Sequence, residues 1–345
     1  MSRRRLTPSL YRWLVAVVVL SLLTSVAVLI YRVTPLEENG IKYRNALVST
    51  PASLGKFSWT PENRPDWFLQ ENEPVPEPWQ TITTAILPDG TGALSNLEKS
   101  KLIARHLVEN VRHRRGIRSN TLDTYHKITD KGLGYCADYA QVFDALAHSA
   151  GIPVREWGIS FGGFGGGHGF NEIYDPEWKK WILIDSFESF YPVDRNSGTP
   201  LSVLEFMSLI GQNRANEIQI VKIDDDHFRR HLKTDQRAFH FYGKGKDQIF
   251  MYGGNSVLTY DSNALVNTLG GISRSLEQMV AIMLGVHPTM LILKTEANAE
   301  ELENLQNRRL FFWGISSLIA ALFIILLLLL VFRSRIVSRD DAAVQ

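Results

Sequence analysis

A cysteine, a histidine and an aspartate in this chain have the types and the order that acyl transfer through a thiol requires. Cys136 is the single cysteine of the sequence, and it follows the glycine-containing run 132–134 at the expected start of a helix. The unpaired amides and the dipole of a helix N-terminus stabilise a thiolate, and the same amides can hold an oxyanion when a carbonyl is attacked. This segment therefore predicts a nucleophile together with the field that activates it.

The base and its orienting group are expected on a hairpin. His168 opens one predicted strand and Asp185 lies near the end of the next, with the turn-forming residues 175–179 between them. Opposite residues of an antiparallel pair have a constant sum of their numbers, so any odd sum places His168 and Asp185 on one face. A carboxylate within reach of cross-strand neighbours can hold an imidazole in its working tautomer. An even sum would exclude this arrangement.

Each of these residues also has a plainer interpretation. An isolated cysteine on a helix is often a small buried apolar residue, and a histidine at a strand start is often a surface residue. Asp185 alone would be read as a turn former at the end of a strand. With one cysteine in the chain no intramolecular disulfide is possible, so a structural role through disulfide pairing is excluded.

Motifs around these residues resemble the transglutaminase-like superfamily of papain-like cysteine enzymes. They are GYCADYA at residues 134–140, AGIPVR at 150–155, HGFNE at 168–172, and Asp185 after the apolar run 181–184. The resemblance covers residues 96–192. It implies an α+β fold in which a nucleophile helix packs on an antiparallel sheet. It also implies that Cys136 is the nucleophile, His168 the base and Asp185 the orienting group.

Two departures from the family pattern concern the shape of the acyl pocket. The family commonly has His-Ala-Trp where this chain has residues 168–170, and Asp-Pro-Thr where it has residues 185–187. Neither change removes a catalytic group, but the substrate is not carried over from the family. Tyr135, Phe161, Phe164 and Phe170 are expected to contact the substrate.

The glycine-rich run at residues 161–167 directly precedes the histidine. Such loops can cradle phosphate, but that site needs a strand, the loop and then a helix, whereas here a strand follows. The run is expected to be a hairpin loop, either a mobile flap beside the active site or simply a long flexible connection.

Charge and composition exclude other classes of function. The chain has 37 Lys and Arg against 36 Asp and Glu, so it lacks the basic footprint of a nucleic-acid-binding protein. Asp224 to Asp226 with His227 and His231 have a metal-like spacing, but the neighbouring arginines oppose a cation. No metal and no cofactor are therefore expected.

Two apolar runs indicate a membrane protein. Residues 13–31 are an uncharged stretch of roughly 19 residues, about the length that crosses a bilayer as a helix, and residues 310–332 form a longer one. A buried core helix, or a cleaved signal peptide for the first run, is the alternative, but the first run is long and no small-residue cleavage site follows it. Arginines flank the outer ends, at positions 3, 4, 5 and 12 and at 333, 335 and 339. They predict that both termini are cytoplasmic, although Arg308 and Arg309 weaken the contrast.

The expected organisation follows from these segments. It comprises a cytoplasmic tail (1–12), a transmembrane helix (13–31), a Pro/Trp-rich arm (32–94), the transglutaminase-like core (95–192), a C-terminal region with a stalk (193–309), a second transmembrane helix (310–332) and a tail (333–345). The arm is expected to pack over the core, or alternatively to line a substrate groove with its tryptophans. Residues 201–287 contain helix-like and strand-like pieces that form no recognisable unit.

These features predict a membrane-anchored extracytoplasmic cysteine enzyme that cleaves or transfers an amide-linked acyl group through a thioester. Its substrate would be a protein or peptide amide, and its location the inner membrane with the main domain in the periplasm. The alternative is a non-catalytic scaffold for an envelope or polysaccharide assembly system, with a partner in the membrane or envelope. Retention of all three catalytic positions favours the enzyme.

Overall fold

The computed structural model describes residues 6–33, 37–88, 91–110, 117, 119–224, 232, 234–270 and 274–333. The fold is mixed α+β, as the sequence predicts. The chain divides into two compact units, one formed by Met1–Ala46 with Asn304–Gln345 and the other by Leu47–Glu303.

The first unit contains two long apolar helices, α1 (Pro8–Val33) and α12 (Ala299–Val331). Within the described residues, both are long and apolar enough to cross a membrane, and they contain the two predicted spans. The Tyr11 hydroxyl near the start of α1 donates to the Leu329 carbonyl near the end of α12 at 3.0 Å. The two helices therefore run antiparallel. The polar residues before the second span are helical and form the first turns of α12, which begins at Ala299.

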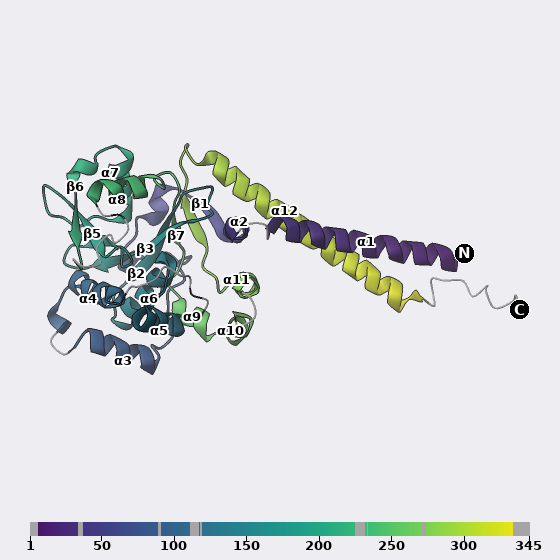
Figure 1. The fold of residues 1–345 in the computed structure, drawn as a ribbon, viewed down its shortest axis with the longest axis horizontal. Coiled ribbons are helices and arrows are strands. Elements are labelled where there is room, and N and C mark those ends of the chain that lie inside the picture. Colours follow the sequence, from purple (N-terminus) through teal and green to yellow (C-terminus); the bar gives the residue numbers. More distant parts are fainter. Residues whose placement is uncertain are drawn as a thin grey trace, which may run out of the picture. The chain divides into compact units, whose positions relative to one another are not determined.

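The second unit is built on a six-stranded sheet with the order β1-β8-β7-β2-β3-β4 (Figure 1). Strands β1 and β8 are parallel, and the other neighbours are antiparallel. Strands β5 and β6 form a separate antiparallel pair. The strands are β1 (Ser49–Ala52), β2 (Val154–Ser160), β3 (Gly167–Asp175), β4 (Lys180–Ile184), β5 (Phe190–Asp194), β6 (Ile218–Lys222), β7 (Ile249–Tyr252) and β8 (Met290–Leu293).

Helices cover both faces of the sheet. Besides α1 and α12, the helices of the described residues are α2 (Glu37–Val48, partly in the first unit), α3 (Glu77–Ile86), α4 (Asn96–Val108), α5 (Thr121–Lys131), α6 (Cys136–Ser149), α7 (Val203–Gly211), α8 (Asp235–Gly243), α9 (Val257–Ser262), α10 (Ala264–Gly270) and α11 (Arg274–Met283). Short 3₁₀ turns lie at Leu54–Phe57, Pro61–Asn63, Thr91–Ala93 and Ala215–Glu217.

Alternation along the strands gives the sheet two apolar faces. On β3 and β4, Ile173, Ile182 and Ile184 belong to a core shared with α4, α5 and α6, which we call the α6 face. Phe170 and Leu183 point to the opposite core, shared with α7 and α8, which we call the α8 face. Figure 1 shows α4, α5 and α6 gathered on one side of the sheet and α7 and α8 on the other.

The nucleophile helix begins at the position where the sequence predicts a helix start. Helix α6 begins at Cys136 and ends at Ser149, and the amide of Ile152 bonds back to the Ala147 carbonyl at 2.8 Å. Gly151 adopts a left-handed φ of 70° directly before the Ile152-Pro153 pair, so the chain turns sharply into β2.

From residue 47 onwards the Pro/Trp-rich arm belongs to the second unit and packs on both faces of the sheet. Trp59 and Phe68 are buried in the core of the α8 face, Trp79 is buried in the core of the α6 face, and β1 from the arm joins the edge of the sheet. The Arg155 guanidinium lies 5.1 Å from the Trp59 ring and 4.2 Å from the Trp181 ring, and its Nε donates to Glu172 at 2.6 Å. This ion pair is buried, so the aromatic rings and the carboxylate of Glu172 take the place of the water that the Arg155 guanidinium would otherwise need. Trp59 therefore has a structural role.

Candidate active site

Cys136 occupies the first turn of α6, where the helix leaves amides without intrahelical partners. The Asp138 carboxylate accepts from the Tyr135 amide at 2.8 Å, and the amides of Asp138 and Tyr139 donate to the Tyr135 carbonyl. Among the hydrogen bonds of the described residues, none uses the amides of Cys136 and Ala137. These two amides are therefore positioned to hold an oxyanion beside the thiol, as the sequence predicts.

The backbone before the nucleophile is fixed by Gly134. Its φ is 125°, and a Cβ at this position would lie 2.9 Å from the Tyr139 ring. An L side chain would be strained there and would push the buried ring away. The glycine-containing run 132–134 is thus a specific turn that presents Cys136 at the helix end.

His168 and Asp185 lie on one face of the hairpin because the register has an odd sum. Asn171 pairs with Ile184 across β3 and β4, so the sum is 355, and His168 and Asp185 are diagonal neighbours on the α8 face. The His168 Nε2 lies 2.5 Å from Asp185 Oδ2, and both side chains are almost wholly buried. The predicted condition on the register is confirmed.

The electrostatics of His168 favour its protonated form. Burial acts to lower the pKa of His168, but the charges of Asp185 and Cys136, with hydrogen bonds to both, raise that pKa well above its ordinary value. Because Nε2 faces Asp185, the other ring nitrogen is the one available to the thiol. This arrangement can maintain a thiolate–imidazolium pair, which is the reactive form of a cysteine nucleophile.

Cys136 and His168 come from different layers of the molecule. The helix α6 packs on one face of the sheet, whereas the imidazole projects from the other face at the start of β3. Gly169 lies between them, and a Cβ on it would be 3.8 Å from the Ala137 Cα. This is an ordinary van der Waals separation, so an alanine would also fit at this position.

Tyr242 is a site residue that the sequence analysis missed. Its hydroxyl donates to Asp185 Oδ2 and lies 3.3 Å from His168 Nε2. It comes from α8, in the region 201–287 that could not be assembled from the sequence. Thr234 is the N-cap of that helix, and its hydroxyl accepts from the Arg237 amide. No sequence motif in the helix indicates a contact with the triad.

The expected substrate-contacting residues divide into two exposed and two buried ones. Tyr135 is 51% exposed and Phe161 is 39% exposed, so both can meet a substrate from solvent. Phe164 and Phe170 are fully buried, which corrects the expectation that their rings contact the substrate directly. Phe170 packs against His168 with ring centroids 5.7 Å apart, so it supports the base from within.

The glycine-rich run is the loop of the β2–β3 hairpin, as predicted. The Phe161 amide donates to the Gly166 carbonyl at 3.0 Å, and the Phe164 amide donates to Gln248 Oε1 at 3.3 Å. Because the Phe164 ring is buried, the middle of the loop is fastened to the core. The idea of a flap beside the active site stays a prediction, and its exposed part is Phe161.

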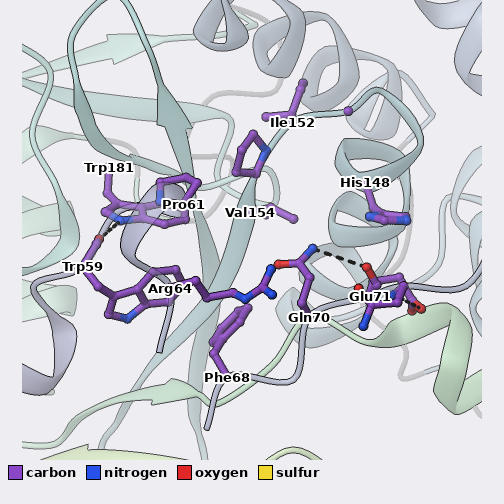
Figure 2. A pocket seen from close by; sticks show the side chains of 13 residues that line it. Trp59, Pro61, Arg64, Phe68, Gln70, Glu71, His148, Ile152, Val154 and Trp181 are labelled. Carbon is purple, nitrogen blue, oxygen red and sulfur yellow. Dashed lines mark hydrogen bonds between the residues drawn. The ribbon is translucent and has the colours of Figure 1, made fainter. Parts of the chain in front are cut away.

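A pocket of about 420 Å³ lies away from the triad (Figure 2). It is formed by the arm and by the C-terminal end of α6, with Trp59, Phe68 and Trp181 as apolar walls and with Arg64, Gln70 and His148 among its polar lining. His148 is twelve residues after Cys136 on the same helix, which corresponds to roughly 18 Å along its axis. This pocket, which includes Trp59 of the arm, therefore lies away from the reacting thiol.

Metal ligands do not cluster in the described residues. No group of three or more His, Cys, Asp or Glu side chains there could hold an ion. Most of the Asp224–His231 segment lies outside the residues that the structure describes.

Comparison with known proteins supports one family. Residues 61–186 match the family model described as Transglutaminase-like superfamily. This segment contains Cys136, His168 and Asp185 but ends before Tyr242. Curated proteins and solved structures give no match to the chain.

Proposed function

We propose that this chain, which carries a transglutaminase-like core, is a cysteine enzyme that cleaves or transfers an amide-linked acyl group through a thioester. The observation that carries the proposal is the buried contact of His168 with Asp185 at 2.5 Å, together with the charge interaction between His168 and Cys136. A thiol, a base and an orienting carboxylate in hydrogen-bonded order are the parts that nucleophilic acyl transfer needs.

The reaction follows from these contacts. The Cys136 thiolate attacks the amide carbonyl, and the amides of Cys136 and Ala137 hold the resulting oxyanion. The imidazolium of His168 gives its proton to the leaving amine, the carbon–nitrogen bond breaks, and a thioester remains on Cys136. His168 then takes a proton from water as water attacks the thioester, which releases the acid and restores the thiolate–imidazolium pair. An amine in place of water would give acyl transfer, but no feature of the site identifies an amine subsite.

The test uses the fact that the chain has one cysteine, so every thiol adduct reports Cys136. In full-length protein in detergent, the folded chain should react with iodoacetamide at pH 6.5 about tenfold or more faster than the chain unfolded in guanidinium, because an ordinary thiol with a pKa of about 8.5 is mostly protonated there. An activated ester should leave a hydroxylamine-labile adduct, seen by intact mass, on the wild type and none on Cys136→Ala. Equal alkylation rates for folded and unfolded chains would refute the enzyme and favour the scaffold.

The location is proposed from the two apolar helices and the arginines outside them. We place both termini in the cytoplasm and the second unit outside it, in the periplasm of a cell with an inner membrane, because positive charge is retained on the cytoplasmic side. Reporter cysteines in the Cys136→Ala chain test this. Ser53→Cys should react with a membrane-impermeant maleimide in cells with an intact inner membrane and a permeabilised outer barrier. Ser338→Cys should react only after lysis, and the opposite pattern would overturn the topology.

A further inference from the structure

The side chain of Tyr242 is enclosed by aromatic rings, and its hydroxyl makes the hydrogen bonds with the triad. Its ring is fully buried. The neighbouring ring centroids lie between 5.2 and 5.9 Å away and belong to Phe206, Phe241, His168, Phe190 and Phe170. A phenylalanine would fill the same apolar space. The hydroxyl is therefore the part of the residue that needs an explanation, since burying it without a partner costs free energy.

That hydroxyl completes the set of donors around the Asp185 carboxylate. Oδ1 accepts from the Glu188 amide at 2.8 Å, and Oδ2 accepts from His168 at 2.5 Å and from the Tyr242 hydroxyl. The 3.3 Å separation between the hydroxyl and His168 Nε2 follows from their sharing one acceptor. Asp185 is fully buried, so these donors take the place of the water that would otherwise stabilise its charge.

We propose that Tyr242 is a positioning residue of the catalytic site, whose hydroxyl keeps Asp185 ionised and holds Oδ2 towards His168. This inference rests on the proposed function. Hydrogen bonds to the charged form of an acid favour that form, and bonds to a charged acceptor are stronger than neutral ones. An ionised Asp185 keeps the imidazolium stable, and the imidazolium keeps Cys136 as a thiolate. Tyr242 thus acts on the nucleophile through two other side chains.

The phenol remains a donor over the working range of pH. Burial and the negative charges of Asp185 and Glu188 raise the pKa of Tyr242 well above its ordinary value, so it does not ionise. The titratable groups that act on it in the described residues are Asp185 and Glu188 from the β4–β5 turn, His168 from β3 and Cys136 from α6. A phenol that stays protonated donates this hydrogen bond throughout the working range, so Tyr242 adds no pH dependence of its own.

The test compares the rate of Cys136 alkylation from pH 5 to 9 in the full chain in detergent. Tyr242→Phe removes the hydroxyl and keeps the ring. The negative charge of Asp185 then loses one of its donors, so the acid limb of the rate profile should move to higher pH and the rate at pH 6 should fall about tenfold or more, because a hydrogen bond to a charged group is lost. The matched control is Tyr174→Phe, at a position on the same strand as His168. Among the hydrogen bonds of the described residues, the Tyr174 hydroxyl contacts no triad member. The profile of this variant should equal that of the wild type.

A second variant keeps the test decisive if Tyr242→Phe fails to fold. 3-Fluorotyrosine at position 242 is nearly isosteric and is a stronger acid, hence a stronger donor. Its acid limb should move downwards, opposite to the phenylalanine variant. A purely structural tyrosine would leave the limb in place in both variants, and that result overturns the proposal while the wild-type profile still supports the enzyme. A wild type without enhanced reactivity below pH 8.5 would overturn the proposed function and this inference together.

Discussion

Two buried aspartates on opposite faces of the six-stranded sheet have different surroundings. On the α8 face, Asp185 accepts from His168, Tyr242 and the Glu188 amide. On the α6 face, Asp144 accepts from Asn171 at 2.7 Å, and its Oδ2 has no hydrogen-bond partner in the described structure. The Asp185 carboxylate is surrounded by hydrogen-bond donors. Burial raises the pKa of Asp144 well above its ordinary value, and the nearby charge of Glu156 raises that pKa further. Burial by itself therefore does not identify a catalytic acid.

The comparison extends to the elements around each aspartate. The α6 face consists largely of helices from the family-matched segment, and it delivers Cys136 at a helix end. The α8 face combines the arm with helices that follow residue 186, and it encloses the base and its orienting group. The nucleophile is thus presented by one layer, while the environment that activates it belongs to the other. Changes on the α8 face should alter chemistry, and changes behind α6 should alter stability.

The largest effect is expected from Asp185→Asn. The amide carries no charge, and if its oxygen accepts from His168 then its NH₂ opposes the Glu188 amide. Both effects destabilise the protonated form of His168, so the alkylation rate of Cys136 at pH 6.5 and any acylation turnover should fall about 10²- to 10⁴-fold. The imidazolium should also be lost at lower pH than in the wild type, because the charge of Asp185 helps to raise the pKa of His168.

The matched control for Asp185→Asn is Asp66→Asn, at an exposed position in the arm. It should leave the pH profile unchanged. If Asp185→Asn keeps rapid alkylation at pH 6.5, then the α8 face does not activate the thiol and the contrast between the two faces fails.

Local patterns allowed the α6 face and the hairpin to be predicted from the sequence. The start of α6 followed from the glycine-containing run before Cys136, and the hairpin followed from a turn cluster between two predicted strands. These signals lie within a few residues of the structure that they specify. The odd register could only be stated as a condition, because it depends on how side chains pack across the sheet.

The environment of Asp185 could not be predicted in the same way. Tyr242 and Asp185 are 57 residues apart in the chain, and their contact depends on how α8 docks on the sheet. Likewise, β1 from the arm pairs with β8 through residues such as Ser49 and Met290, which no local pattern connects. The expectation that Phe170 contacts the substrate failed for a related reason. Strand alternation places Phe170 on the same face as His168, but it does not show which residues cover that face.

A smaller effect, confined to stability, is expected from Asp144→Asn. The raised pKa means that the folded protein binds this proton more tightly than the unfolded chain does. The contribution of Asp144 to stability is therefore fully present below its ordinary pKa of about 3.8 and is lost as the pH rises through the raised folded value. Asparagine cannot ionise, its oxygen can still accept from Asn171, and its NH₂ can face Glu156. The variant should unfold at a higher temperature than the wild type at pH 8, and the difference should shrink towards pH 4.5.

Thermal unfolding at several pH values, with Cys136 alkylation measured on the same samples, separates the two faces. The alkylation rate of Asp144→Asn should stay within about twofold of the wild type, because the change lies behind α6 and leaves the donors of Asp185 intact. The exposed Asp66→Asn variant should show neither the gain at pH 8 nor its pH dependence. If Asp144→Asn slowed alkylation tenfold, the proton held behind the helix would be coupled to the thiol, and the α6 face would belong to the chemistry as well as to the scaffold.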